Sequence, residues 1–145
     1  MSDFRKLLVW QKAHALALHV DRAAVSIRAA RYASLRSQLI RAAMSIPANI
    51  AEGRRQESER EFARFLRYAV NSACELEYHL VVVRDIGALD VRECDALMAE
   101  LIEVRRMLHG ILNRITKSTP TAKRDAPDSS PQGAPVSEVL PSTPV

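Results

Sequence analysis

The feature that most constrains the fold is a heptad spacing of apolar residues in three separate segments. Within each segment they recur at alternating steps of three and four residues, which places them on one face of an α-helix. The three stripes are Val9, Ala13, Leu16, Val20, Ala23 and Ile27; Phe62, Leu66, Ala69, Ala73, Leu76, Leu80 and Val83; and Cys94, Leu97, Leu101, Val104, Leu108, Ile111 and Ile115. Such stripes are typical of long antiparallel helices that cross at shallow angles.

A fourth stripe contains a proline. It consists of Leu35, Leu39, Ala42, Ala43, Ile46 and Ile50. Pro47 lacks a backbone N–H and crowds the carbonyl group of Ala43, so it should kink or break a helix. We expect a kinked helix, in which Ser45 and Asn49 satisfy the freed carbonyls and small neighbouring residues allow another helix to approach closely. A break between two short helices is the alternative.

Signals at the helix ends divide residues 3–116 into four helices. Ser58 and Glu61 have the spacing of a capping box, and Asp90 with Glu93 predicts a similar helix start. Gly87 should end the third helix after Ile86. The predicted fold is therefore all-α, an up-down four-helix bundle that occupies residues 1–116.

The remaining segment, residues 117–145, has a different composition. It holds six of the seven prolines and few large apolar residues. A segment of this kind cannot bury enough surface to offset the entropy cost of ordering. We therefore predict a disordered Pro/Ser-rich tail, with a docking peptide as the alternative.

Charge is distributed unevenly along the chain. Residues 1–70 hold 13 Lys and Arg against 6 Asp and Glu, whereas residues 71–116 hold 5 against 8. Arginine outnumbers lysine 17 to 4, and its planar guanidinium group binds phosphate oxygens in pairs. A basic half is typical of a protein that binds a polyanion; the alternative is that these arginines only solvate helix surfaces.

The sequence predicts a soluble, cytoplasmic protein. No apolar run approaches the roughly 18 residues that span a bilayer, and the N-terminal segment lacks the apolar core of a secretory signal. Two cysteines are too few for a disulfide-stabilised secreted scaffold. We expect no membrane partner.

No pattern of catalytic or cofactor-binding residues is present in the sequence. The Glu-x-x-His pairs of di-iron bundles, the His-x-x-x-His spacing of zinc sites and the glycine-rich phosphate-binding loop are all missing. His14, His19, His79 and His109 are expected on the surface or at the edge of a seam, and Cys74 and Cys94 as small core residues. We therefore predict a non-enzymatic protein without a metal or cofactor.

Several motifs give the chain a family resemblance. Four motifs resemble the 23S rRNA intervening-sequence protein family: WQKA at Trp10–Ala13, the SQL-x-RAA-x-SIPANIAEG run at Ser37–Gly53, the S-x-x-EF-x-x-FL run at Ser58–Leu66 and ELE at Glu75–Glu77. That family includes the accessory variability determinants of diversity-generating retroelements. The resemblance implies a four-helix protomer in a ring-like homopentamer and, in the retroelement branch, association with a reverse transcriptase and nucleic acid.

The first interhelix turn departs from the family pattern. Ile27-Arg28 and Ala33–Arg36 stand where relatives usually have a Phe-Pro turn and an aromatic–Gly–Leu–Thr sequence, although Ser34 could still cap the second helix. This difference puts in doubt any partner surface near the turn.

Two sets of residues are the candidate functional positions. The predicted nucleic-acid contacts are Arg54, Arg55, Arg60, Arg64, Arg67, Arg28, Arg31 and Arg36. The predicted oligomer or packing motif is Ser45, Ile46, Pro47, Asn49, Ile50, Glu52 and Gly53. Surplus apolar residues also favour self-association: Leu7, Trp10, Leu18, Val25, Met98, Ile102 and Leu112.

These features predict a homo-oligomeric accessory protein that binds RNA or DNA through surface arginines. Arg60, Arg64 and Arg67 follow at steps of four and three, so they should share one helix face, with Arg54 and Arg55 in the loop before it. The alternative is a protein-interaction scaffold with no direct contact to nucleic acid, whose arginines pair with acids such as Glu57 and Glu61.

Overall fold

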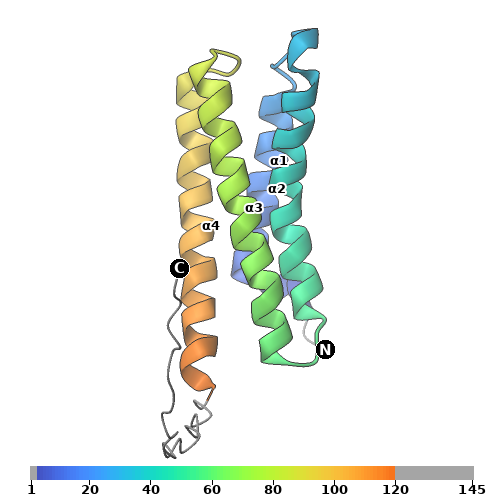
Figure 1. The fold of residues 1–145 in the computed structure, drawn as a ribbon, viewed down its shortest axis with the longest axis vertical. Helices are drawn as coiled ribbons and strands as arrows, with labels where there is room; N and C mark the ends of the chain where they lie inside the picture. Colours follow the sequence, from blue (N-terminus) through green and yellow to red (C-terminus); the bar gives the residue numbers. More distant parts are fainter. Residues whose placement is uncertain (1–2, 120–145) are drawn as a thin grey trace, which may run out of the picture.

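The computed structural model describes residues 3–119, which form four α-helices and two short 3-10 helices without any strand. The 3-10 helices are η1 (Phe4–Lys6) and η2 (Ala30–Tyr32), and the α-helices are α1 (Leu8–Ala24), α2 (Ala33–Arg54), α3 (Glu59–Asp85) and α4 (Val91–Ser118). Successive α-helices run in opposite directions along one long axis (Figure 1). The predicted up-down four-helix bundle is confirmed.

The core consists of the residues that the heptad spacing selects. Every position of the first stripe is buried, and Leu16, Leu66 and Leu101 have no exposed surface. Each such side chain contributes about 1.5–3 kcal/mol by leaving water. Only the end positions Leu35, Phe62, Ile111 and Ile115 are half-buried, where they pack against the edge of the core.

Helix α2 runs through Pro47 without interruption, so the alternative of two short helices is wrong. The Asn49 side-chain amide donates to the Ser45 carbonyl oxygen at 2.8 Å and to Ser45 Oγ at 3.1 Å. Ser45 Oγ in turn lies 2.9 Å from Ser72 Oγ of α3. Asn49 thus binds the carbonyl of Ser45 and not that of Ala43, which is the carbonyl that Pro47 deprives of its helical donor, so its predicted role is corrected. The two hydroxyl groups join α2 to α3.

Gly53 marks a close approach of α2 and α3. A Cβ atom at this position would lie 2.7 Å from Phe65 Cβ and 3.1 Å from Phe62 Cδ2. No side chain fits at the first of these distances without a shift of the helices. The glycine that ends the SIPANIAEG run is therefore required for packing inside the protomer.

The helix ends of α3 follow the predicted signals. Ser58 Oγ accepts a hydrogen bond from the Glu61 backbone N–H at 3.1 Å, and Gly87 adopts the left-handed conformation with φ 71° just after Ile86. Asp90 precedes α4, but its side chain makes no capping bond, which corrects that prediction.

The first interhelix turn differs from the prediction. Helix α1 ends at Ala24, and Ile27 is buried beyond its end. Ser34 does not cap α2, because the helix already begins at Ala33, after η2, and the Ser34 hydroxyl accepts from Gln38 Nε2 instead. The Arg36 guanidinium donates to the Ile27 carbonyl oxygen and fastens the turn to α2.

At the C-terminal end, α4 extends to Ser118, two residues beyond the predicted boundary at Thr116. The predicted tail, apart from residues 117–119, lies outside the described residues.

Candidate nucleic-acid interface

Helix α3 presents a row of arginines to solvent. Arg60, Arg64 and Arg67 are all exposed, while Leu66 and Ala69 on the other side of the helix are buried. The helical spacing places these arginines as the sequence predicts, on a face away from the seam. We call these three residues the arginine face.

The middle arginine of this face has contacts within the helix. Arg64 Nη2 lies 2.9 Å from Glu61 Oε2, and its guanidinium carbon lies 5.3 Å from the centre of the Phe65 ring and 5.9 Å from that of Tyr68. An exposed pair of this kind is worth only about 0.2–0.5 kcal/mol, so the arginine can exchange it for a phosphate. No ion pair involves Arg60 or Arg67 among residues 3–119.

The turn between α2 and α3 adds two more arginines. Arg54 is the last residue of α2, which corrects its predicted place in the loop, whereas Arg55 follows the helix and lies in the turn as predicted. Arg55 is exposed. Arg54 is half-buried, with its guanidinium carbon 5.7 Å from the centre of the Phe62 ring. Arg54 thus already contacts an aromatic side chain at the edge of the core.

A groove of about 350 Å³ separates this turn from the last turns of α4. Arg54, Glu59 and Phe62 form one wall, and Ile111, Arg114, Ile115 and Ser118 form the other. We call it the end groove. The sequence alone does not point to Arg114, because only the folded bundle brings the end of α4 beside the α2–α3 turn. The available signal is its position between Ile111 and Ile115 of the heptad stripe.

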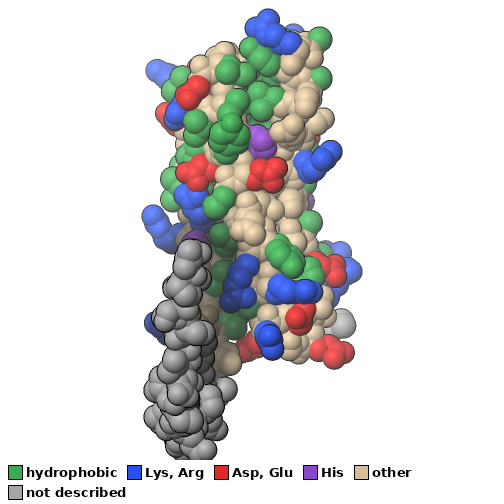
Figure 2. Space-filling model, viewed as in Figure 1, with side chains coloured by type: hydrophobic (Ala, Val, Ile, Leu, Met, Phe, Trp, Pro, Cys, Tyr) green, Lys and Arg blue, Asp and Glu red, His purple; other side chains and the backbone are tan. Residues whose placement is uncertain are grey.

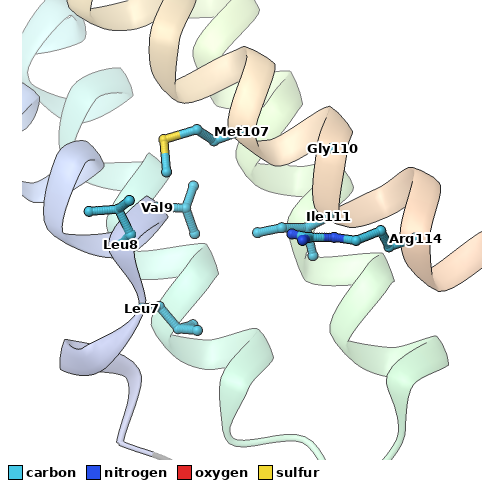
Figure 3. A pocket seen from close by; sticks show the side chains of 7 residues that line it. All are labelled: Leu7, Leu8, Val9, Met107, Gly110, Ile111 and Arg114. Atoms are coloured by element: carbon cyan, nitrogen blue, oxygen red, sulfur yellow. The ribbon is translucent and has the colours of Figure 1, made fainter.

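Arg114 also borders a second, apolar groove of about 540 Å³ between the start of α1 and α4. Its side chain extends from α4 alongside Ile111 and faces the start of α1 (Figure 3). The other lining residues are Leu7, Leu8, Val9, Met107 and Gly110. Arg114 and Ile111 therefore belong to both grooves, which adjoin along α4.

The other three predicted arginines lie at the opposite end of the bundle, near the α1–α2 turn (Figure 1). Arg28 is exposed, and Arg31 lies over the Tyr32 ring with its guanidinium carbon 4.7 Å from the ring centre. Arg36 is tied to the Ile27 carbonyl, as described above. The eight candidates therefore form two separate groups.

Charge of both signs lies around the α2–α3 turn. Figure 2 shows Lys and Arg side chains interspersed with Asp and Glu towards this end of the visible face, while hydrophobic side chains are more frequent towards the other end. A polyanion binding here has to avoid carboxylates such as Glu57 and Glu59, both of which are exposed.

The residues of the predicted oligomer motif lie mainly inside the protomer. Ile46, Pro47, Ile50 and Gly53 are buried, Ser45 and Asn49 are half-buried, and Glu52 is exposed. The outward side of α2 in this region carries Met44 and Ala48, both exposed. Any neighbour that binds α2 must contact those residues rather than Pro47.

The histidines and cysteines are placed only partly as predicted. His14, His19 and His109 are exposed, whereas His79 is buried at 6% exposure, with Nε2 3.5 Å from Glu75 Oε1. Cys94 is buried, and burial raises the pKa of its thiol. Cys74 is exposed, which corrects the prediction, since it lies one residue beyond the buried Ala73 on the outer side of the seam.

Side-chain pairs connect α4 to its neighbours. Arg105 of α4 donates to Glu77 of α3, and this hydrogen bond raises the pKa of Arg105. Lys12 Nζ lies 3.1 Å from Glu103 Oε1, and His19 Nδ1 lies 2.7 Å from Glu100 Oε1, which joins α1 to α4. The two glutamates of the ELE run therefore serve different roles, because Glu75 is exposed on another side of α3.

No cluster of three potential metal ligands exists within residues 3–119. None of the helices in that range is both long enough and apolar enough to cross a membrane.

Comparison with known proteins assigns this bundle to a protein family. The model of the 23S rRNA-intervening sequence protein family matches residues 5–110, most of the chain. The chain belongs to this family. The family resemblance of the sequence motifs is therefore confirmed, and the matched region begins in η1 and ends within α4.

A solved structure shares the family fold. It is the crystal structure of a protein of unknown function from the S23 ribosomal protein family of Bacteroides thetaiotaomicron, with a TM-score of 0.68 and 22% sequence identity. The alignment covers 72% of this chain and 98% of that one. At this identity the likeness shows a common fold. No curated protein matches the chain.

Proposed function

We propose that this family member is a non-enzymatic, cytoplasmic accessory protein that binds RNA or DNA through the arginine face of α3 and works as a homo-oligomer. The observation that carries the proposal is the exposure of Arg60, Arg64 and Arg67 on one side of a rigid helix. Arginines in such a row contact phosphates without selecting bases.

A second observation supports nucleic acid over other polyanions. Tyr68 is 42% exposed and lies beside Arg64 on the same helix. Base stacking on an aromatic side chain adds affinity that is tolerant of sequence. Binding should therefore be weak, independent of sequence and steeply dependent on salt, since each phosphate contact contributes about 0.7–0.9 log units of affinity per decade of salt.

The test is fluorescence anisotropy with a labelled RNA, for the wild-type protein and for the triple variant Arg60→Glu, Arg64→Glu, Arg67→Glu. We expect the triple variant to bind at least tenfold more weakly at low salt, because attraction to phosphate becomes repulsion. Circular dichroism and size-exclusion chromatography should show unchanged helicity and oligomeric state, since all three side chains are exposed.

A matched control separates a local effect from one of net charge. Arg22, Arg41 and Arg92 are exposed arginines outside the candidate set, and changing all three to Glu alters the net charge equally. The control variant should lose much less affinity than the arginine-face variant. Equal losses in the two variants, or no binding by the wild-type protein at low salt, would remove the nucleic-acid function.

Exposed apolar residues support self-association. Leu18 and Val25 lie seven residues apart on the outside of the first helical segment, and Val25 is 69% exposed. On α2, Met44 and Ala48 are exposed apolar residues as well. The family resemblance implies a pentamer, and a ring would repeat the arginine face on every subunit, which multiplies weak phosphate contacts.

An interaction scaffold is the second candidate function, and one observation favours it. Ile86 and Val91 are exposed at the α3–α4 turn. Tyr78, which lies two helical turns before the end of α3, is 65% exposed. An apolar surface of this kind fits a protein partner, such as the reverse transcriptase that the resemblance implies. A variant with Tyr78→Ser and Ile86→Ser would lose that partner while retaining any RNA binding.

A further inference from the structure

The end groove brings together groups from three helices that the sequence separates widely. Arg54 comes from the end of α2, Phe62 from the first turns of α3, and Arg114 with Ile115 from the end of α4. Its two arginines stand on opposite walls, and its apolar lining comes from Phe62, Ile111 and Ile115.

The size of the groove limits what it can hold. Its volume of about 350 Å³ exceeds the roughly 150 Å³ of an engineered cavity that takes up benzene. One planar ring system with an attached sugar or phosphate at the mouth therefore fits. A paired duplex does not enter, because its bases are stacked inside the helix and only its backbone reaches such a surface.

The lining chemistry matches a base attached to a phosphate. Bases of single strands stack on aromatic rings and on the planar guanidinium groups of arginine, and the Arg54–Phe62 pair offers both at one wall. Ile115 supplies an apolar surface opposite, and Arg114 supplies a cation at the border with the neighbouring groove (Figure 3).

We propose that the end groove binds one unstacked base of a single-stranded RNA or DNA, between the Arg54–Phe62 pair and Ile115, with the adjacent phosphate on Arg114. This inference rests on the proposed nucleic-acid function and narrows its ligand to single strands. The arginine face begins at Arg60, in the same turn of α3 as Phe62 but on the other side of the helix, so the groove and the arginine face contact separate parts of a strand.

Glu59 gives the groove a negative group on the same wall as Phe62. Its carboxylate repels a neighbouring phosphate, so the side chain reduces affinity unless it accepts a hydrogen bond from a base N–H group. Glu59→Gln removes the charge and keeps the shape. We expect Glu59→Gln to strengthen binding of a strand of 3-methyluridine, whose bases carry no N–H donor, by about twofold to threefold through an interaction of the order of 0.5 kcal/mol.

The experiment compares a labelled, non-self-complementary 20-nucleotide strand with its duplex by anisotropy at one low salt concentration. We expect the wild-type protein to bind the single strand at least tenfold more tightly. Phe62→Leu should weaken single-strand binding by about fivefold or more, since stacking on one aromatic is worth about 1–3 kcal/mol. Its melting temperature must be measured, because Phe62 also packs against the core.

Arg114→Glu is the variant that leaves the core untouched, since Arg114 is exposed. It should weaken single-strand binding several-fold and lower the salt slope by about 0.7, the contribution of one phosphate contact. Arg106→Glu is the matched control, an exposed arginine on the same helix outside both grooves. Its effect should be small and equal for the strand and the duplex.

The outcomes separate this inference from the proposed function. Equal affinity for strand and duplex, or equal effects of Arg114→Glu and Arg106→Glu, overturns the base-binding groove. If the arginine-face triple variant still loses binding in that case, the proposed function stands. Absence of binding to both probes overturns the two together.

Discussion

Gly53 lies where the backbone of α2 comes within reach of the α3 side chains, so it gives the clearest residue-scale test of the packing. Gly53→Ala would place a Cβ atom 2.7 Å from Phe65 Cβ. We expect a loss of about 1–3 kcal/mol in the free energy of unfolding, the usual cost of overpacking a core. Urea denaturation monitored by circular dichroism measures it.

Gly110 provides the matched control for that prediction. It also lies inside a helix, but a Cβ atom there would have no contact within 4 Å. Gly110→Ala should therefore stabilise the protein by up to about 1 kcal/mol, because alanine loses less conformational entropy in a helix. If both substitutions have the same sign, the close α2–α3 approach is not as described.

The two cysteines should differ in reactivity. Exposed Cys74 should react with a thiol reagent such as DTNB within minutes under native conditions, whereas buried Cys94 should react only after unfolding. Quantification of thiols with and without denaturant distinguishes them, and Cys74→Ser should abolish the native reaction. Fast native reaction of two thiols per chain would contradict the burial of Cys94.

Burial of Cys94 also gives a pH dependence. Its pKa in the folded state lies above the ordinary value of 9.0, because burial disfavours the thiolate. The stabilisation that Cys94 provides is fully present below pH 9, where the thiol is protonated in both the folded and the unfolded state. It is lost as pH rises through the raised pKa, because the thiol ionises first in the unfolded state and this lowers the free energy of that state. The difference in stability between wild type and Cys94→Ala should shrink across that window.

At the scale of the helices, sequence periodicity predicts most of the side chains that are buried. The stripe positions determine which side of each helix is buried, because a wrong rotation would expose Leu66 of α3 or Leu101 of α4. Periodicity does not determine whether a residue next to the stripe is buried. The prediction that Cys74 is a core residue was therefore wrong, although the preceding Ala73 is buried. It also cannot show that Arg54 and Arg114, sixty residues apart, line one groove.

The turns were the least predictable elements. Ser58 caps α3 because its hydroxyl has an N–H of α3 within reach, whereas Asp90 has the same spacing signal and makes no side-chain bond. The backbone differs at the two positions, with φ −113° at Ser58 and −57° at Asp90, and the spacing of two residues does not determine this angle. The role of Arg36 in binding the Ile27 carbonyl equally depends on how the first turn folds back.

These caps give an element-scale prediction. Ser58→Ala should lower the free energy of unfolding by about 1 kcal/mol, because the Glu61 N–H loses its partner at the helix start. Asp90→Ala should cost clearly less, since no side-chain bond is lost there. Thermal and urea unfolding of both variants provide the measurement, and a larger loss for Asp90→Ala would show that the capping assignment is reversed.

At the scale of the whole molecule, the bundle leaves apolar residues on the outside of several helices. A small bundle of this kind buries only about two-thirds of its chain surface, and the surplus favours a contact with further copies. The buried residues of the SIPANIAEG motif pack inside the protomer, where Gly53 contacts α3. Only the outer side of α2 is therefore left in this region to contact another copy.

The oligomeric state is the prediction that follows at this scale. Mass photometry should find a species near five times the protomer mass of 16.2 kDa. Ala48→Glu puts a large charged group on the outer side of α2, where a close helix contact cannot accommodate it, and should shift the distribution towards smaller species. Gln38→Glu, exposed on another face of the same helix, should leave the mass unchanged. A wild-type monomer at micromolar concentration would exclude the ring, and the arginine face would then bind nucleic acid without the gain that repetition provides.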